Sequence, residues 1–282
     1  MTLIIGMSKP EGLYLSVDYR ISNPRTRVRI HDESIKSLTI HYPPFDNRGP
    51  KVLLGFTGMA ELPGGTPILT WIRETLRGET EVIDQSMAHL RKRLNRDIAS
   101  RREALMINFL VLEPYRRLFG GFTNVRIPPP GQDPVVPGFK YIMNRLDAWT
   151  IFANGSGAER LVKDGHFDRL RPHLGIVPRE PMNHMKLLAS MNRRVAAKDS
   201  TVSPFCQVSF IGSSNRFPPT SHVFTEKGES VPFEMPLLIG GVDTTEWTRE
   251  FHRNSEALFR GEISSLPGID IDKANEQLKR RP

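Results

Sequence analysis

Cysteine is almost absent from this sequence, because Cys206 is the only one among 282 residues. A single cysteine cannot form a disulfide within the chain, and no histidine or second cysteine stands near it at the spacing of metal ligands. We expect Cys206 to be a small, buried apolar residue, with a nucleophile as the alternative. Neither a bound metal nor an organic cofactor is expected.

Long apolar runs are also missing. No stretch approaches the ~20 apolar residues of a membrane-spanning helix, and the segment Met1–Arg20 has neither the basic start nor the continuous apolar middle of a signal peptide. We therefore expect a cytoplasmic protein without a membrane partner. Hydrophobic residues make up 38% of the chain and charged residues 25%, which is the range of globular proteins with a sizeable core.

Acidic residues are outnumbered, with 31 Asp and Glu against 39 Lys and Arg, for a formal charge of +8. Much of the excess lies in one predicted helix and its exit: Arg91, Lys92, Arg93, Arg96, Arg101 and Arg102. Such a stripe could follow a phosphate backbone. No zinc-finger, helix-turn-helix or aromatic RNA-binding motif accompanies it, so we favour a solvated helix face or a subunit contact over nucleic-acid binding.

The first sixty residues alternate apolar and polar side chains in short runs separated by Pro, Gly and Asn turns. This pattern predicts five consecutive strands, arranged as an antiparallel meander. The runs are Leu3–Met7, Gly12–Asp18, Arg25–His31, Lys36–His41 and Val52–Thr57.

Further along the chain the period of the apolar residues changes to that of helices. Helices are expected over Ile68–Leu76, Ile83–Ile98, Pro181–Ala197 and Thr244–Phe259, with strands at Trp149–Ala153 and Phe205–Ile211 and an apolar run at Leu105–Leu112. The Pro-rich segment Ile127–Gly138 is expected to be a projecting loop. Because no Gly/Ser-rich linker divides the chain, we expect one core over residues 1–211. Residues 212–282 would form an extension packed on it and used in assembly.

Thr2 directly follows Met1, and a residue as small as threonine permits methionine aminopeptidase to remove Met1. The hydroxyl and a free amine would then belong to one residue. A terminal amine has a pKa near neutrality, so it could accept the hydroxyl proton and make Thr2 both nucleophile and general base. A threonine at position 2 is common, however, and alone indicates little.

The strands after Thr2 resemble the opening of proteasome β subunits. Thr2-Leu3-Ile4-Ile5-Gly6 and the strand that ends in Asp18-Tyr19-Arg20 match that family without a gap. Lys36 resembles the family's buried lysine, and Thr57-Gly58 its oxyanion-stabilising pair. Two later segments fit the same family: Gly155-Ser156-Gly157, and Asp199-Ser200-Thr201-Val202-Ser203, which has one extra residue. The resemblance covers residues 2–211.

The resemblance implies an α+β fold, the four-layer αββα sandwich of N-terminal-nucleophile (Ntn) hydrolases, in which two antiparallel sheets lie between helices. It also implies roles for the matching residues. Thr2 would be the nucleophile, Lys36 its electrostatic activator, Asp18 the partner of Lys36, and Gly58 the oxyanion donor, with Arg20 fixing Asp18. The remaining implied roles are orientation of the Thr2 amine by Ser156, Asp199 and Ser203, and contact with the substrate side chain by Phe56 and Ala60.

Each residue has a simpler reading: Asp18 and Lys36 as an ordinary ion pair, Gly58 as a turn glycine, Ser156 as a helix cap. Phe56 could equally face the core. For the whole protein, the resemblance implies a threonine-type peptidase that acts on peptide or unfolded-protein substrates in a ring of identical subunits, and an ATP-dependent unfoldase as a possible partner. A small-molecule amidohydrolase of the same fold and an inactive scaffold are the alternatives.

Overall fold

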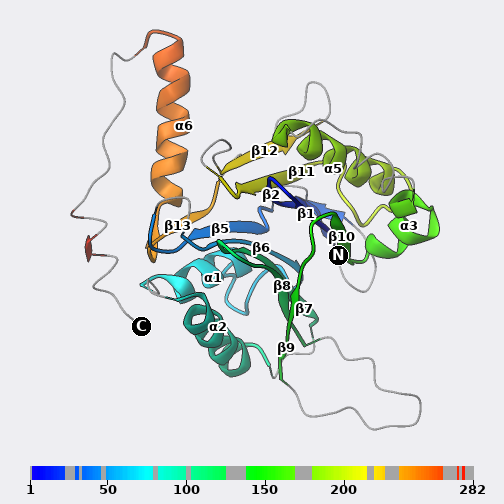
Figure 1. Cartoon of the computed structure of the whole chain (residues 1–282), viewed down its shortest axis with the longest axis horizontal. Helices are drawn as coiled ribbons and strands as arrows, with labels where there is room; N and C mark the ends of the chain where they lie inside the picture. Colours follow the sequence, from blue (N-terminus) through cyan, green and yellow to red (C-terminus); the bar gives the residue numbers. More distant parts are fainter. Residues whose placement is uncertain are drawn as a thin grey trace.

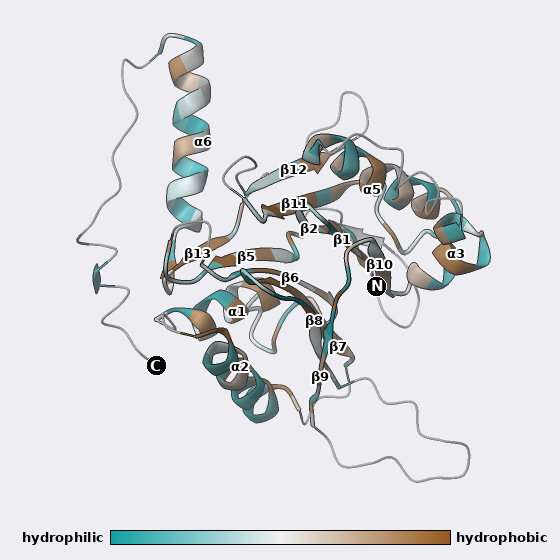
Figure 2. Cartoon of the chain, viewed as in Figure 1, coloured by the Kyte–Doolittle hydropathy of each residue, from teal (hydrophilic) through white to brown (hydrophobic). Residues whose placement is uncertain are grey.

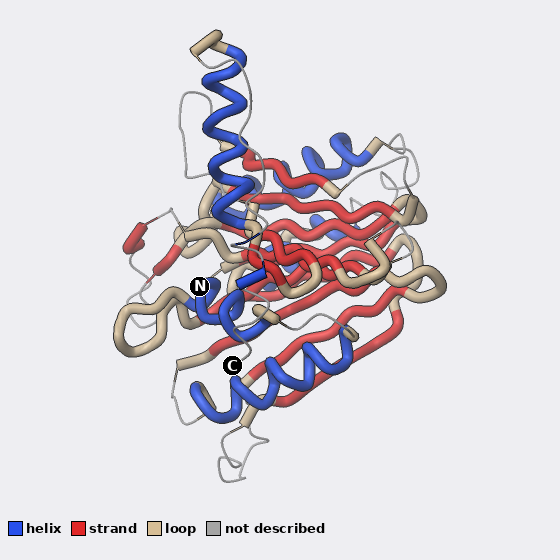
Figure 3. Tube along the Cα trace, turned by 90° about the vertical axis from the view of Figure 1, so that its left-hand side faces the viewer, coloured by secondary structure: helices blue, strands red, loops and turns tan. Residues whose placement is uncertain are grey.

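Two β-sheets are stacked face to face, and helices cover both outer faces (Figures 1 and 3). The computed structural model describes residues 2–22, 29–31, 34–45, 49–78, 82–99, 103–124, 138–168, 180–214, 219–225, 235–262, 272 and 275–276. The expected α+β sandwich is confirmed. The expected loop Ile127–Gly138 lies outside the described residues except for Gly138.

The first sheet has five strands, and every pairing in it is antiparallel. Its strands lie in the order β10 (Thr150–Gly155), β1 (Leu3–Lys9), β2 (Gly12–Asp18), β11 (Cys206–Gly212) and β12 (Thr220–Phe224). Helices α3 (Ala158–Lys163) and α5 (Pro181–Ala196) cover its outer face. The strand that follows Thr2 is therefore an inner strand, with a neighbour on each side.

The second sheet has seven strands. They lie in the order β14 (Val242–Asp243), β13 (Leu237–Ile239), β5 (Ser37–His41), β6 (Lys51–Gly58), β7 (Leu105–Leu112), β8 (Arg117–Thr123) and β9 (Lys140–Arg145). Only the pairing of β13 with β5 is parallel among these described strands. Helices α1 (Ile68–Leu76) and α2 (Ile83–Asp97) lie on the outer face.

Three clusters of buried apolar side chains among the described residues account for the four layers. One packs α1 and α2 against the seven-stranded sheet, one packs α3 and α5 against the five-stranded sheet, and the third lies between the sheets. Strand β1 shows the division: Leu3 and Ile5 face the helices, whereas Ile4 faces the other sheet. Because both faces of the inner strands are buried, they are mostly apolar along their length (Figure 2).

The predicted five-stranded meander is wrong. Strands β1 and β2 pair with each other in one sheet, and β5 and β6 pair in the other. Between them, β3 (Ile21–Ser22) and β4 (Arg29–His31) pair with each other in a separate two-stranded sheet, and residues 25–28 of the predicted strand Arg25–His31 lie outside the described part. Strand periodicity shows that a face is buried, but it does not show which sheet buries it.

The four predicted helices are confirmed, and no end differs from its predicted position by more than one residue. Pro67 precedes α1 in an extended conformation, and Pro181 opens α5, where a missing backbone N–H costs nothing. Strands β8 and β9 were not predicted. Adjacent glycines, Gly120 and Gly121, interrupt β8, and β9 is a largely exposed edge strand that lacks the apolar alternation used to recognise the others.

Residues beyond 211 contribute to both sheets. Strand β12 forms an edge of the five-stranded sheet, and β13 pairs with β5 of the seven-stranded sheet. Helix α6 (Thr245–Phe259) follows and stands clear of the sandwich (Figures 1 and 3). The use of residues 212–282 in assembly stays a prediction. Within the described residues, no helix combines the length and apolar character required to cross a membrane.

Candidate active site

Thr2 lies at the start of β1 and is 1% exposed. The neighbouring strand β10 ends beside it, where Leu3 pairs with Gly155. Gly155 has a φ of +91°, and a Cβ atom there would lie 2.0 Å from the carbonyl oxygen of Thr2. Only glycine therefore permits this close passage, which fixes the turn containing Ser156 next to the first residues of the strand.

Lys36 directs its ammonium group at the Thr2 hydroxyl. The Nζ atom lies 2.6 Å from Thr2 Oγ1 and 3.4 Å from Asp18 Oδ1, and it also donates to the backbone carbonyl of Arg20. The Lys36 side chain is 3% exposed. Burial of an ammonium group is costly unless its donors are satisfied, and these three acceptors offset that cost.

Asp18 is held at the end of β2 by backbone amides. Its Oδ1 atom accepts a hydrogen bond from Leu3 N at 3.1 Å, and its Oδ2 atom accepts bonds from Ser203 N at 2.9 Å and Arg20 N at 3.3 Å. Three chain segments thus converge on one buried carboxylate. This network fixes the position of the acid against which Lys36 is placed.

Arg20 was expected to fix Asp18, and its backbone N–H contacts that carboxylate. Its guanidinium has another role: Nη1 donates to the carbonyl oxygens of Ser200 and Val202, each at 2.8 Å. The side chain therefore holds the turn after α5 against the end of β2. This interaction joins the two groups of predicted site residues.

A small cavity of about 10 Å³ lies over the Thr2 hydroxyl. Six of the predicted residues line it: Thr2, Arg20, Lys36, Phe56, Gly58 and Ala60. Ile21 and Thr57 complete the lining: Thr57 belongs to the predicted Thr57-Gly58 pair but had no role assigned to it, and Ile21 was not predicted. Residues from β1, β5, β6 and the segments beside them thus meet at one end of the sandwich.

Gly58 ends β6 at the rim of this cavity and has a φ of +100°. A Cβ atom there would lie 2.0 Å from the carbonyl oxygen of Ala104. The position therefore requires glycine for both conformation and space. Its backbone is exposed at the cavity rim, where a donor to the oxyanion would have to lie. The role of Gly58 as that donor stays a prediction.

From the sequence, Phe56 could face either the substrate or the core, and its side chain contacts both regions. It lines the cavity, and it also belongs to the core cluster under α1 and α2, together with Leu54 from the same strand face. The next residue, Thr57, has its side chain on the opposite face of β6, where its Oγ1 atom would lie 3.5 Å from a Cβ at Gly155. The hydroxyl of Thr57 thus lies near Gly155, in the turn that contains Ser156.

Ser156 and Asp199 meet through Thr201, which was not predicted as a site residue. Thr201 Oγ1 lies 2.6 Å from Asp199 Oδ1 and 3.3 Å from Ser156 Oγ. The signal was present in the sequence as the extra residue between Asp199 and Ser203. With that insertion, Thr201 stands two positions after Asp199, and its hydroxyl forms the hydrogen bond to the Asp199 carboxylate. The Thr201 backbone N–H donates to the same carboxylate at 2.9 Å.

Ser203 is oriented differently from its predicted role. Its backbone N–H binds Asp18, while its Oγ accepts a hydrogen bond from Phe205 N at 3.1 Å. Asn192 of α5 donates to its carbonyl oxygen at 2.6 Å. Ser203 therefore positions Asp18 through the backbone, and orientation of the Thr2 amine by its hydroxyl stays a prediction.

Cys206 is fully buried at the start of β11, in the apolar cluster beneath α5. Burial raises the pKa of its thiol to about 12, which leaves almost no thiolate near neutral pH. Its environment is that of the small apolar residue expected from the sequence. No group of three potential metal ligands occurs among the described histidine, cysteine, aspartate and glutamate residues.

The basic stripe on α2 is partly neutralised within its own helix. Arg93 and Arg96 both pair with Asp97, at 3.1 Å and 2.6 Å. Arg91 and Lys92 project from the same helix beside Tyr141, whereas Arg101 and Arg102 lie outside the described residues. The pairing within the helix reduces the charge available to a nucleic acid.

No family model and no curated protein matches this sequence. Among solved structures, a Gly-1 mutant of Anbu from Hyphomicrobium sp. strain MC1 aligns with a TM-score of 0.50 and 13% identity, over 96% of this chain and all of that one. Anbu from Pseudomonas aeruginosa, solved as a helical assembly, gives 0.49 and 10% over 95% and 98%. Anbu from Yersinia bercovieri, described as an ancestral beta-subunit, gives 0.46 and 13% over 95% and 99%. This chain thus shares the sandwich fold of the Hyphomicrobium protein at low sequence identity.

Proposed function

We propose that this chain is an amidohydrolase of the proteasome-like type, in which Thr2 becomes the N-terminal nucleophile after Met1 is removed. The observation that carries the proposal is the contact of 2.6 Å between Lys36 Nζ and Thr2 Oγ1, inside a buried network anchored on Asp18. A lysine that only balanced Asp18 would not need to approach a hydroxyl at the start of a strand. A small cavity lies over that hydroxyl.

The network can activate the hydroxyl by charge. The Thr2 amine accepts the hydroxyl proton, and the Lys36 ammonium stabilises the negative charge that develops on Oγ1. Asp18, held by three backbone amides, keeps Lys36 charged and in place. Because these groups are fixed before substrate binds, little reorganisation is needed during the reaction.

The reaction proceeds in two steps. Thr2 Oγ1 attacks the amide carbonyl, and the N–H of Gly58 stabilises the oxyanion while the Thr2 ammonium gives its proton to the leaving nitrogen. The C–N bond breaks and leaves an ester on Thr2. Water, deprotonated by the same amine, then attacks the ester and releases the acid, which restores the Thr2 hydroxyl. Ser156, Thr201 and Asp199 form the polar network proposed to orient the amine.

The proposed substrate is a peptide or unfolded protein with a small side chain next to the scissile bond. The cavity measures only about 10 Å³, and Phe56 and Ala60 are among the residues that line it. A panel of fluorogenic peptides that differ only at that side chain tests this proposal. Release from the peptides with small residues supports it, whereas exclusive cleavage of non-peptide amides favours a small-molecule amidohydrolase instead.

Removal of Met1 is the first requirement of this mechanism, because a retained methionine blocks the amine that acts as base. We expect protein purified from its native cell to begin with Thr2. Intact mass spectrometry, supported by N-terminal sequencing, measures this directly. Retention of Met1 in essentially every molecule would exclude Thr2 as its own base and would favour an inactive scaffold.

Assembly into a closed homo-oligomer is also proposed, together with cytoplasmic location and delivery of substrate by an ATP-dependent unfoldase. Helix α6 supports the assembly. Its base is fixed, since Asp243 pairs with Arg73 at 2.7 Å, yet Phe251 further along the helix is 56% exposed. An apolar side chain on a helix that projects from a rigid base is suited to contact another subunit.

We expect Phe251→Asp to shift the protein from an oligomer to a smaller species, because the new charge would be buried at a subunit contact. Light scattering at micromolar concentration reports the mass, and the melting temperature should change little. Val162→Asp is the matched control, because Val162 is 65% exposed on the short helix α3. A wild-type protein that is a stable monomer would overturn the proposed ring and leave the fold untouched.

A further inference from the structure

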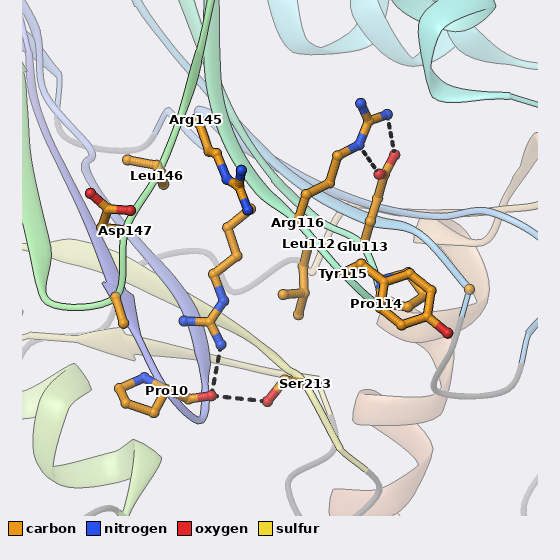
Figure 4. A pocket seen from close by; sticks show the side chains of 13 residues that line it. Pro10, Leu112, Glu113, Pro114, Tyr115, Arg116, Arg145, Leu146, Asp147 and Ser213 are labelled. Atoms are coloured by element: carbon orange, nitrogen blue, oxygen red, sulfur yellow. Dashed lines mark hydrogen bonds and ion pairs between the residues drawn. The ribbon is translucent and has the colours of Figure 1, made fainter.

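A second cavity, larger than the one over Thr2, lies at the opposite end of the sandwich. Its volume is about 480 Å³, within the ~300–1,000 Å³ typical of small-molecule sites. The turn at Pro10, the hairpin between β7 and β8, and the segment after β9 form its walls (Figure 4). Since β1 runs from Thr2 to this turn, the two cavities are separated by the length of a seven-residue strand, roughly 25 Å.

Two guanidinium groups in this cavity form no ion pair with a carboxylate among the described residues, although Glu11 acts electrostatically on Arg117. Arg117 donates to the backbone carbonyls of Lys9 at 2.5 Å and Pro10 at 2.7 Å, which fix the group without cancelling its charge. Arg145 ends β9 and is exposed, and within the described chain it makes neither a hydrogen bond nor an ion pair. Figure 4 shows its side chain extending into the cavity without a dashed contact.

A third arginine in the same wall is already neutralised. Arg116 binds Glu113 through both Nε and Nη2, the latter at 3.0 Å, as Figure 4 shows. The remaining acid in the lining is Asp147. With Arg117 and Arg145 positive and Asp147 negative, the residues that line the cavity have an excess of about one positive charge, part of which Glu11 offsets from outside the lining. This balance favours a monoanion over a dianion.

Apart from Ser213, the remaining side chains of the lining are apolar or aromatic. Leu112, Pro114 and Leu146 contribute apolar surface, and Tyr115 at the hairpin tip is 94% exposed. An inorganic ion would leave most of this volume to water. A planar carboxylate matches the two parallel donors of a guanidinium, and an attached apolar body would cover the leucine and proline side chains.

We propose that this cavity binds a small carboxylate with an apolar or aromatic body, and that Arg145 is the residue that recognises the carboxylate. Arg117 supplies a fixed second charge beneath it, and the hairpin with Tyr115 covers the body of the ligand. The site is independent of the chemistry at Thr2. No step of the proposed hydrolysis uses any of these residues.

The test uses the full chain and 4-fluorobenzoate, with binding followed by ¹⁹F NMR. The neutral 4-fluorobenzamide has the same body without the charge, and inorganic phosphate supplies the charge without the body. We expect 4-fluorobenzoate to bind with a dissociation constant below about 1 mM and at least about tenfold more tightly than the amide or phosphate. Equal binding of the amide, tighter binding of phosphate, or no binding of the benzoate overturns the proposal.

Arg145→Gln is the decisive variant, since this exposed side chain has no partner and its loss should not affect folding. It should weaken binding of 4-fluorobenzoate about tenfold or more, because one charge-assisted interaction is lost. The double variant Arg116→Gln with Glu113→Gln is the matched control in the same cavity, and its affinity should stay within about twofold of wild type, because it removes an ion pair whose charges already cancel. Equal affinities for Arg145→Gln and wild type, or equal losses in both variants, overturn the assignment. Peptide hydrolysis measured on the same samples separates this result from the fate of the proposed function.

Discussion

Replacement of Thr2 by alanine should reduce peptide hydrolysis by more than about 1,000-fold, because one residue supplies both the nucleophilic hydroxyl and the base. Alanine is small enough for Met1 still to be removed, so the variant keeps the free amine and loses only the hydroxyl and one methyl group. Labelling by an electrophile that captures N-terminal threonine should disappear with activity. Measurement of kcat/KM with the fluorogenic panel quantifies the loss.

Two variants separate a chemical role for Thr2 from a structural one. Thr2→Ser restores a hydroxyl at the same place and should recover part of the activity. Thr150→Ala removes a threonine hydroxyl at the far end of β10, where Oγ1 contacts the carbonyl of Asp147 at 2.9 Å, and should leave turnover unchanged. Wild-type activity in Thr2→Ala would remove Thr2 from the mechanism. No activity in any protein, wild type included, would leave only the inactive scaffold or a missing activator.

Lys36→Met should have the second largest effect, a loss of about 100-fold or more in kcat, together with a marked loss of stability. The Thr2 hydroxyl would lose the cation at 2.6 Å that stabilises its alkoxide. Asp18 would remain charged and buried without its partner, which typically costs about 3–5 kcal/mol of unfolding free energy. Chemical denaturation measures the second effect, and steady-state kinetics on the remaining folded protein measures the first.

Stability and activity can be separated by comparison with other lysine and arginine variants. The double variant Lys36→Met with Asp18→Asn removes both charges, so it should regain stability without regaining turnover. Lys51→Met removes a lysine that is 4% exposed, at the other end of the sandwich, where its Nζ donates to the carbonyl of Gly212 at 3.3 Å. It should lower stability and spare kcat/KM. Arg91→Ala, on the exposed face of α2, should change neither. Full activity in the folded double variant would refute activation by Lys36.

The sequence predicted the helices because their apolar period of 3.6 residues and their proline starts are local signals. It also predicted most residues of the cavity over Thr2. That prediction came from motifs that occur in the same order as in a known family, and not from any distance between residues. Asp18 and Arg20 were easy to place for a further reason: Asp18 ends the strand that pairs with β1, and Arg20 lies two residues further on. For residues this close along the chain, sequence spacing alone is sufficient to predict that they lie close together.

The sequence by itself determined the secondary structure of the inner strands and helices, and the kinds of residue available for catalysis. Tertiary structure decided the rest. Pairing of β2 with β11 brought Ser203 to Asp18, an insertion after Asp199 gave the bridging bond to Thr201, and two hairpins placed Arg145 and Arg117 in one cavity. These contacts join segments up to about 190 residues apart. Alternation along a strand records only that a face is buried, so the choice of partner strand depends on packing of the complete sheets.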